Sequence, residues 1–316
     1  METRESRRRG LRSGARQPPR SGRRQNHSAG LRALAARIRV KLPRRKLVDE
    51  ILRQLPAGAP VLDLGCGPGS FPAAAYPLRV IRSDIDAAVR PRPENFVASD
   101  AAALPFPEGL FSAVILNHSL GHIRDARAVF KEIGRVLAPA GCLYIAIPDA
   151  STFSDRLYRW LAKGGGHVNP ISDPAALVRA VQELTGLDHI ATRLLFTSFC
   201  FLNRKHVAGR RLLESRRLLR YGSFGTDLEL PLKWATLILR WLDRWTGARL
   251  SAYGWAFYFG PFFEIETAPS SNVCIRCGSG HAAAWLLAGS RVTRPRVGIR
   301  WFACPTCGAR NFFTPD

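Results

Sequence analysis

The chain of 316 residues has no uncharged apolar run of about eighteen residues or more, the length that a membrane-spanning helix requires. Its arginine-rich beginning also lacks the apolar stretch at the centre of a secretory signal. We therefore expect no transmembrane helix and no export signal. We place the protein in the cytoplasm, and peripheral contact with the inner face of the membrane stays open.

Lysine is scarce, and the acidic residues are unevenly spread. The chain has 47 Lys and Arg residues, 24 acids and a formal net charge of +23. Sixteen of the basic residues but only two acids fall within residues 1–46. This composition predicts a basic arm over residues 1–45, disordered up to about residue 30, with a short basic amphipathic helix at 31–42. Such an arm can bind RNA or an anionic membrane surface, although the Arg and Ala bias also fits a GC-rich coding sequence.

The most informative segment is VLDLGCGPG at residues 61–69. An apolar run, expected to be a buried strand, leads into a turn that contains Gly65, Gly67 and Gly69. Glycine has no Cβ and tolerates a positive φ, so a ligand can lie directly on such a turn. Asp63 precedes the turn, and we expect a helix to begin just after it, with its first N–H groups free to bind.

This turn resembles motif I of the class I S-adenosylmethionine (SAM)-dependent methyltransferases, in particular the type 11-like group. Dinucleotide-binding folds use the spacing G-x-G-x-x-G, whereas the spacing here is G-x-G-x-G. The resemblance covers about residues 46–149. It implies an α/β fold with a Rossmann-like seven-stranded sheet, SAM as the cofactor and methyl transfer as the activity.

Two further acids stand where this family contacts SAM. Asp84 ends a predicted strand at residues 79–84, and it is expected to accept hydrogen bonds from the ribose, with Asp86 as the alternative. By resemblance, Asp100, at the end of a third strand, and the N–H of Ala101 bind the adenine edge. The complete set of expected SAM contacts is Asp63, Gly65, Cys66, Gly67, Gly69, Asp84, Asp100, Ala101 and Asn117.

The elements that follow keep the order of the family. We expect a fourth strand at 113–116, a helix with apolar residues at helical spacing, a turn at Pro139 and Gly141, and a fifth strand at 142–147. A helix within 173–190, a sixth strand at 190–201 and a seventh at 254–260 would complete the domain. The methyltransferase domain is thus predicted over residues 46–267.

An insertion at about residues 203–253 interrupts this domain. One helical stripe in it carries Trp234, Leu237, Ile238, Trp241, Leu242 and Trp245. We interpret this stripe as a lid or wall of the substrate cleft. Contact with a membrane surface is the alternative, because basic amphipathic helices with tryptophan suit one.

Four cysteines form a second motif near the end of the chain. Cys274 and Cys277 make one C-x-x-C-G repeat, and Cys304 and Cys307 make another. Four thiolates suit tetrahedral Zn²⁺ and leave no open position, so we predict a structural zinc ribbon at residues 270–316. Two disulfides or a redox pair are the alternatives. His281 is surplus to a four-cysteine site.

The sequence says little about the methyl acceptor. His118, His122 and His167 are weak candidates for a general base. The chain lacks the Asn/Asp-Pro-Pro-aromatic motif of amino-group DNA methyltransferases, and no Pro-Cys pair follows the fourth strand. We expect an acceptor that is a small molecule, a glycan or a lipid-linked compound. An RNA methyltransferase that grips rRNA or tRNA with its arm and ribbon, and a non-catalytic SAM-binding adaptor, are the alternatives.

Overall fold

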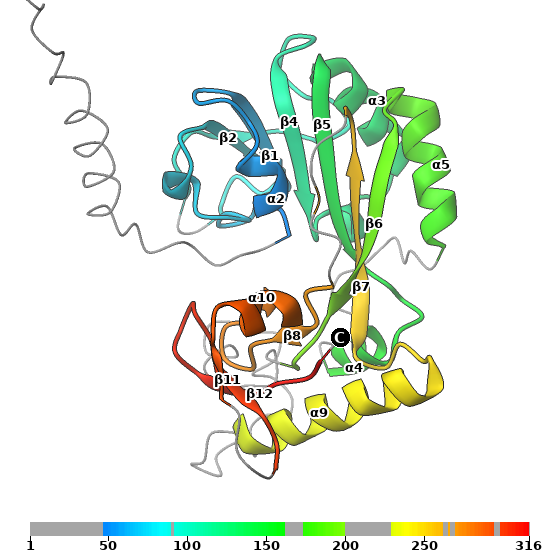
Figure 1. The fold of residues 1–316 in the computed structure, drawn as a ribbon. Coiled ribbons are helices and arrows are strands. Elements are labelled where there is room, and N and C mark those ends of the chain that lie inside the picture. The colour runs from blue at the N-terminus through cyan, green and yellow to red at the C-terminus, as the bar shows by residue number, and fades with distance from the viewer. Residues whose placement is uncertain are drawn as a thin grey trace, which may run out of the picture. The chain divides into compact units, whose positions relative to one another are not determined.

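The computed structural model in Figure 1 describes residues 47–89, 92–161, 173–199, 229–261, 265, 269–293 and 298–315. The predicted basic arm, its helix at 31–42 and His167 lie outside these residues.

A seven-stranded sheet with the order β3–β2–β1–β4–β5–β7–β6 organises most of the described chain (Figure 1). Its strands are β1 (Pro60–Leu64), β2 (Arg79–Asp84), β3 (Phe96–Ala98), β4 (Phe111–Asn117), β5 (Leu137–Pro148), β6 (His189–Phe196) and β7 (Ala252–Phe259). β7 is antiparallel to both of its neighbours, and the other pairs are parallel. The predicted Rossmann-like seven-stranded α/β fold is confirmed.

The central strands are buried because helices or loops cover both faces of the sheet, as parallel sheets require. One core joins β1, β4 and β5 to α3 (Ala126–Val136) and α5 (Pro174–Thr185). The core on the other face includes the short helix α2 (Asp49–Leu52). Asp125 and Asp173 cap α3 and α5 by accepting hydrogen bonds from backbone N–H groups of the first turn.

The helix expected directly after the glycine turn does not form. Only a 3₁₀ turn, η1 (Ala73–Ala75), occupies this place. Pro72 lies before it in an extended conformation, with ψ 97°, and Pro77 follows shortly after. Because proline lacks an N–H and disfavours a helical conformation in the preceding residue, the segment between the two prolines cannot extend into a longer helix.

The fifth strand begins earlier than the sequence suggests. β5 starts at Leu137, which pairs with Phe111, and the register then shifts so that Ala113 pairs with Cys142. The predicted turn at Pro139 and Gly141 is therefore a bulge within β5. A side chain at Gly141 would lie 2.9 Å from the Ala138 carbonyl oxygen, so this bulge needs glycine.

The remaining elements connect strands of the sheet or lie near the C-terminus. They are η2 (Leu120–His122), α4 (Phe153–Leu161), α9 (Glu229–Thr246), β8 (Asn272–Val273), β9 (Gly280–His281), α10 (Ala283–Ala288), β10 (Val292–Thr293), β11 (Trp301–Ala303) and β12 (Arg310–Phe312). β8 pairs with β9, and β10, β11 and β12 form a three-stranded sheet. Within the described residues, no helix combines the length and apolar character needed to cross a bilayer.

Candidate functional site

The turn after β1 passes very close to the segment that follows β4. Gly65 has φ +66°, and a Cβ built on it would lie 2.3 Å from the Cβ of Ser119. The Ser119 hydroxyl donates a hydrogen bond of 2.9 Å to the Leu64 carbonyl. Position 65 therefore requires glycine both for its backbone conformation and for lack of space.

A buried charge holds the far end of the glycine turn. The Asp63 carboxylate is fully buried, and its Oδ2 accepts a hydrogen bond of 3.0 Å from the N–H of Ser70. The same oxygen lies 3.7 Å from Nε of Arg82, whose Nη2 donates to the Phe71 carbonyl at 3.1 Å. Asp63 thus ties the turn to β2 from within the protein.

Asp84 links the end of β2 to the middle of the turn. Its Oδ2 accepts a hydrogen bond of 2.8 Å from the N–H of Gly67, and its Oδ1 accepts one of 3.1 Å from Asp86. Gly67 has φ +49°, and a Cβ there would meet no atom within 4 Å. The turn is therefore fixed on the protein side and open on the other.

A cavity of about 700 Å³ lies at this open side. This volume falls within the range of ligand pockets, about 300–1,000 Å³. Its walls come from the carboxyl ends of the strands, where ligands bind in open α/β sheets. The lining residues are Leu64, Gly65, Cys66, Gly67, Asp84, Ile85, Ser99, Asp100, Ala101, Ala102, His118, Ser119, His122, Ile123, Arg124 and Asp125.

Six of the nine residues expected to contact SAM line this cavity: Gly65, Cys66, Gly67, Asp84, Asp100 and Ala101. Asp63, Gly69 and Asn117 do not line it. Asp63 is buried beneath the turn, Gly69 lies against the Arg82 guanidinium, and Asn117 is the last residue of β4.

The loop after Asp100 is positioned by two residues that sequence reasoning missed. Asp100 starts the loop by accepting a hydrogen bond of 2.9 Å from the N–H of Ala102. Further along, Glu132 on α3 accepts a 2.8 Å hydrogen bond from the Leu104 N–H, and Arg135 donates to the Leu104 carbonyl at 3.0 Å. The two side chains also pair with each other at 2.7 Å. The sequence signal that could have indicated this pair is the spacing of an acid and an arginine by three residues on a predicted helix.

His118 occupies a left-handed conformation, with φ +63°, at the rim of the cavity. Its backbone N–H donates to the Ala146 carbonyl at 2.8 Å, and its Nε2 lies 3.3 Å from the hydroxyl oxygen of Tyr253 on β7. Such a conformation is rare for a residue with a side chain and often marks a functional position. His122 also lines the cavity and is exposed.

Cys66 lines the same cavity but is not a reactive thiolate. Burial, together with the charges of Asp63 and Asp84, raises the pKa of its thiol to about 12. At neutral pH the side chain is therefore a neutral thiol, which removes covalent catalysis by Cys66 from the chemistry that this site offers.

The second candidate site is a cluster of four cysteines. The four Sγ atoms of Cys274, Cys277, Cys304 and Cys307 lie within 4.8 Å of one another. The Sγ atoms of Cys274 and Cys307 are 3.6 Å apart, and those of Cys277 and Cys304 are 3.7 Å apart. Zn–S bonds of about 2.3 Å at tetrahedral angles put two sulfurs about 3.8 Å apart, so the cluster fits a zinc ion. All four cysteines are free, and none forms a disulfide.

The two knuckles of the cluster have the same backbone geometry. Gly278, with φ +70°, donates its N–H to the Cys274 carbonyl at 2.9 Å. Gly308, with φ +72°, donates to the Cys304 carbonyl at 2.8 Å. Each glycine closes its turn in the left-handed conformation, which explains why C-x-x-C is followed by glycine twice.

Polar groups surround the sulfur atoms. The Arg276 N–H and the Asn311 side-chain amide lie 3.4 and 3.5 Å from Sγ of Cys274, the Ser279 hydroxyl lies 3.3 Å from Sγ of Cys277, and Nε2 of His281 lies 3.5 Å from Sγ of Cys304. Such contacts orient thiolate ligands and reduce their charge. His281 thus lies beside the sulfurs in addition to the four cysteines.

The family model and the curated relatives that match this chain are methyltransferases. A family described as "Methyltransferase domain" matches residues 36–191. The malonyl-[acyl-carrier protein] O-methyltransferase of Legionella pneumophila is 30% identical over 127 residues, which cover 36% of this chain and 45% of that protein. The demethylmenaquinone methyltransferase of Renibacterium salmoninarum is 34% identical over 117 residues, which cover 34% and 49%. The chain thus spans about half the length of these curated relatives.

Among solved structures, a putative methyltransferase from an antibiotic biosynthesis pathway of Anabaena variabilis covers 70% of this chain and 99% of its own, with 18% identity and a TM-score of 0.47. The family match covers the glycine turn and the residues that line the cavity, so this chain resembles a methyltransferase domain over residues 36–191.

Proposed function

We propose that this protein transfers a methyl group from SAM to a small-molecule or lipid-linked acceptor. The observation that carries the proposal is the cavity of about 700 Å³ at the glycine turn, with Asp84 and Asp100 on its walls. The relatives support the acceptor class, because their names refer to malonyl-acyl carrier protein, demethylmenaquinone and, for a third relative from Arabidopsis thaliana, cycloartenol.

The residues around the cavity suit a bound SAM molecule. Gly65 and Gly67 would let its amino acid part lie against the backbone, Asp84 would accept hydrogen bonds from the ribose, and Asp100 with the N–H of Ala101 would face the adenine. SAM supplies an activated methyl group on a sulfonium. The task of the protein is therefore to align the acceptor for an in-line displacement and to exclude water.

His118 is the best-placed group to receive a proton from an acceptor, and Tyr253 is placed to orient it. The left-handed backbone of His118 carries its ring to the cavity rim, and the Tyr253 hydroxyl lies 3.3 Å from Nε2. A hydrogen bond donated by the Nε2–H of His118 to the tyrosine oxygen would orient the imidazole in the manner of a base that is held by a partner, with Nδ1 as the nitrogen that accepts the proton. This assignment gives His118 the role of proton acceptor and Tyr253 that of a positioning residue.

The test uses methyl-labelled SAM, the purified full chain and a cell extract separated into RNA, protein, lipid and small-molecule fractions. We expect the label in the lipid or small-molecule fraction. Label in RNase-sensitive material would overturn the proposed acceptor class in favour of RNA. Tight SAM binding without label in any fraction would favour the non-catalytic adaptor.

We also propose that Cys274, Cys277, Cys304 and Cys307 hold one structural Zn²⁺. Four thiolates would saturate a tetrahedral ion, so the metal would stabilise the fold of residues 270–316 and would not activate water. The sulfur spacings of 3.6 and 3.7 Å support this assignment over disulfides. Metal analysis of the purified chain tests it, with one zinc per chain as the expected result.

A further inference from the structure

The exposed large apolar side chains of the described chain are concentrated on one helix. Nine such residues are at least about a third exposed, and five of them are on α9: Leu230, Trp234, Ile238, Trp241 and Trp245. Two more, Phe153 and Trp160, are on α4. Isolated exposed apolar residues need no explanation, but a group of this size on one helix indicates a contact surface.

The five residues on α9 share one face. They are spaced by four, four, three and four residues, which places all of them on one side of a helix with 3.6 residues per turn. The rings of Trp241 and Trp245 stack at 6.0 Å with an interplanar angle of 10°. We refer to these five residues as the tryptophan face. It is not the lid that the sequence favoured, because no residue of α9 lines the cavity at the glycine turn.

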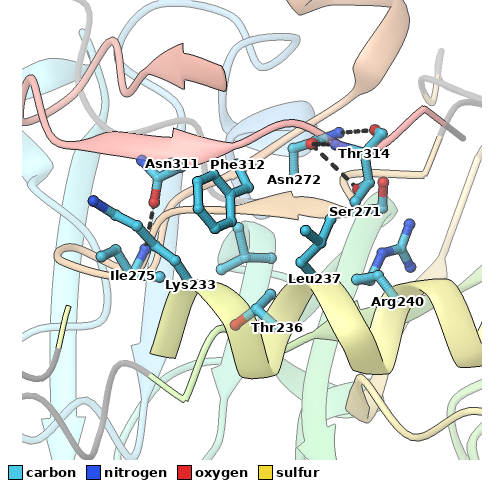
Figure 2. A pocket seen from close by; sticks show the side chains of 11 residues that line it. Lys233, Thr236, Leu237, Arg240, Ser271, Asn272, Ile275, Asn311, Phe312 and Thr314 are labelled. Atoms are coloured by element: carbon cyan, nitrogen blue, oxygen red, sulfur yellow. Dashed lines mark hydrogen bonds between the residues drawn. The ribbon is translucent and has the colours of Figure 1, made fainter. Parts of the chain in front are cut away.

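The opposite side of α9 is occupied by the rest of the protein. Leu232 and Arg240 are buried, and the Arg240 guanidinium lies over the Phe196 ring of β6. Figure 2 shows Lys233, Leu237 and Arg240 directed toward the C-terminal strands. The space between them is about 10 Å³, which is room for about one water molecule and not for a ligand. The helix is therefore fixed with most of its tryptophan face outward; the ring of Trp234 is partly exposed and also contacts Phe312 of β12, with 5.1 Å between the ring centroids.

The charges of α9 complement an anionic surface. Its two acids make internal contacts: Glu229 pairs with Arg276 at 2.7 Å, and Asp243 accepts hydrogen bonds from the N–H groups of Leu250 and Ser251. The remaining charged residues are basic. Lys233 and Arg244 fall on the same flank of the tryptophan face, about a quarter-turn from its centre by helical geometry. Lys233 is half-buried and lines the space beside the C-terminal strands, whereas Arg244 is exposed and donates one hydrogen bond of 3.5 Å to the Pro315 carbonyl.

We propose that the tryptophan face of α9 lies on an anionic lipid surface. Helices that lie in a membrane interface combine an apolar face containing tryptophan with basic residues at its border. A second copy of this chain is a poorer occupant, because each copy has a formal net charge of +23 and brings the same basic flank to the contact. The proposal is independent of the methyl transfer, since vesicle binding requires neither SAM nor an acceptor.

The experiment measures binding of the full chain to vesicles of equimolar phosphatidylglycerol and phosphatidylcholine, with pure phosphatidylcholine as the reference. We expect binding to the anionic vesicles, and we expect Trp241→Ser together with Trp245→Ser to weaken it by about tenfold or more. Ile299→Ser is the matched control, because it removes an exposed apolar residue of the C-terminal module and should leave binding unchanged.

A charge variant tests the basic flank separately. Arg244→Gln should weaken binding about fivefold, since one basic residue near an anionic membrane contributes about 1 kcal/mol. Lys131→Gln, an exposed residue of α3, should leave binding within about twofold.

Brominated lipids distinguish membrane binding through the tryptophan face from membrane binding through the basic arm. Residues 1–46 contain no tryptophan, so quenching of tryptophan fluorescence by brominated lipid reports only on the folded part of the chain. We expect quenching in the wild type. Vesicle binding without quenching would overturn the proposal, and so would binding that the double tryptophan variant retains. A wild-type dimer that the double variant converts to monomer, without vesicle binding, would assign the face to a second copy.

Discussion

The sheet and the C-terminal module of this protein are stabilised in different ways. The sheet has a large apolar core on each face, and one of these cores combines buried residues from four strands and two long helices. The core of the C-terminal module has only seven buried residues, and two of these are cysteines that belong to the proposed zinc site. A module with so small a core cannot offset the entropy of ordering its chain by apolar burial alone. We therefore expect the sheet to fold without a metal and the module to require the proposed zinc.

The largest expected effect is the loss of one cysteine, which should unfold the C-terminal module and leave the sheet folded. In Cys304→Ser the proposed zinc should fall from one per chain to none, because three thiolates bind it far more weakly. Structural zinc is worth about 10–16 kcal/mol in small domains, so the module should unfold. Hydrogen exchange should show lost protection at residues 272–314 and retained protection in β1 and β4.

Cys142→Ser is the matched control for that variant. Cys142 is buried in the sheet core and is not part of the cysteine cluster. The variant should keep one zinc per chain and a protected module. If Cys304→Ser kept its zinc, or if its module stayed protected without metal, the contrast between the two regions would be wrong.

The second prediction concerns the close contact within the sheet region. Gly65→Ala combines a strained φ with a clash against Ser119, so it should destabilise the protein by several kcal/mol and abolish SAM binding. Gly109→Ala is a closely matched control, because Gly109 has the same φ of +66° but has no atom within 4 Å of its Cβ position. It should cost only about 1–2 kcal/mol, the strain of the left-handed conformation. Equal losses in denaturant unfolding would show that the contact with Ser119 does not matter.

The contrast also explains what could be predicted from the sequence. The glycine turn and the cysteine knuckles depend on local spacing, and the sequence therefore indicates them well, whereas the order of elements along the chain followed from the family resemblance. The helix expected after the turn does not form because of Pro72 and Pro77. Both prolines are evident in the sequence and argue against that helix. The burial of Asp63 beneath the turn and the contact of His118 with Tyr253 depend on residues far apart in the chain. No local pattern encodes such contacts.

The direction of α9 was not predictable for a similar reason. The stripe of tryptophans fits either a lid or an outer face, and the choice depends on which side packs against the rest of the protein. The bidentate pair of Arg276 with Glu229 and the contact of Trp234 with Phe312 attach the start of α9 to the C-terminal module. The module thus orients the helix, which gives the proposed zinc a function beyond its own residues.

A third prediction tests whether Asp84, at the end of β2, contributes to SAM binding. Asp84→Ala should weaken SAM binding by about tenfold to a hundredfold, because a hydrogen bond to a charged group contributes about 1.5–3 kcal/mol. Calorimetric titration with SAM measures this change. Asp86→Ala is the control, since Asp86 is the alternative ribose ligand but does not line the cavity. If Asp86→Ala weakened binding more than Asp84→Ala, the ribose contact would belong to Asp86.

The smallest expected effect tests how the loop at residues 104–106 is held against α3. The Arg135 side chain, by hydrogen bonding to Glu132, lowers the pKa of the Glu132 carboxyl. A lowered folded-state pKa means that the charged carboxylate stabilises the fold above the pKa of the unfolded state, about 4.3, and that this contribution disappears as the pH falls through the folded pKa. Glu132→Gln should therefore reduce the free energy of unfolding by about 1 kcal/mol at pH 7, and the difference from wild type should vanish in acid.

Glu183→Gln provides the comparison for this last variant. Glu183 pairs with Arg127 at 3.0 Å, but both side chains are more than half exposed, so solvent screens the pair and its loss should change stability little. A difference between the two variants at pH 7 that closes at low pH would identify Glu132 as the anchor of the loop. Because that loop continues the wall formed by Asp100 and Ala101, Glu132→Gln should also weaken SAM binding modestly, whereas Glu183→Gln should not.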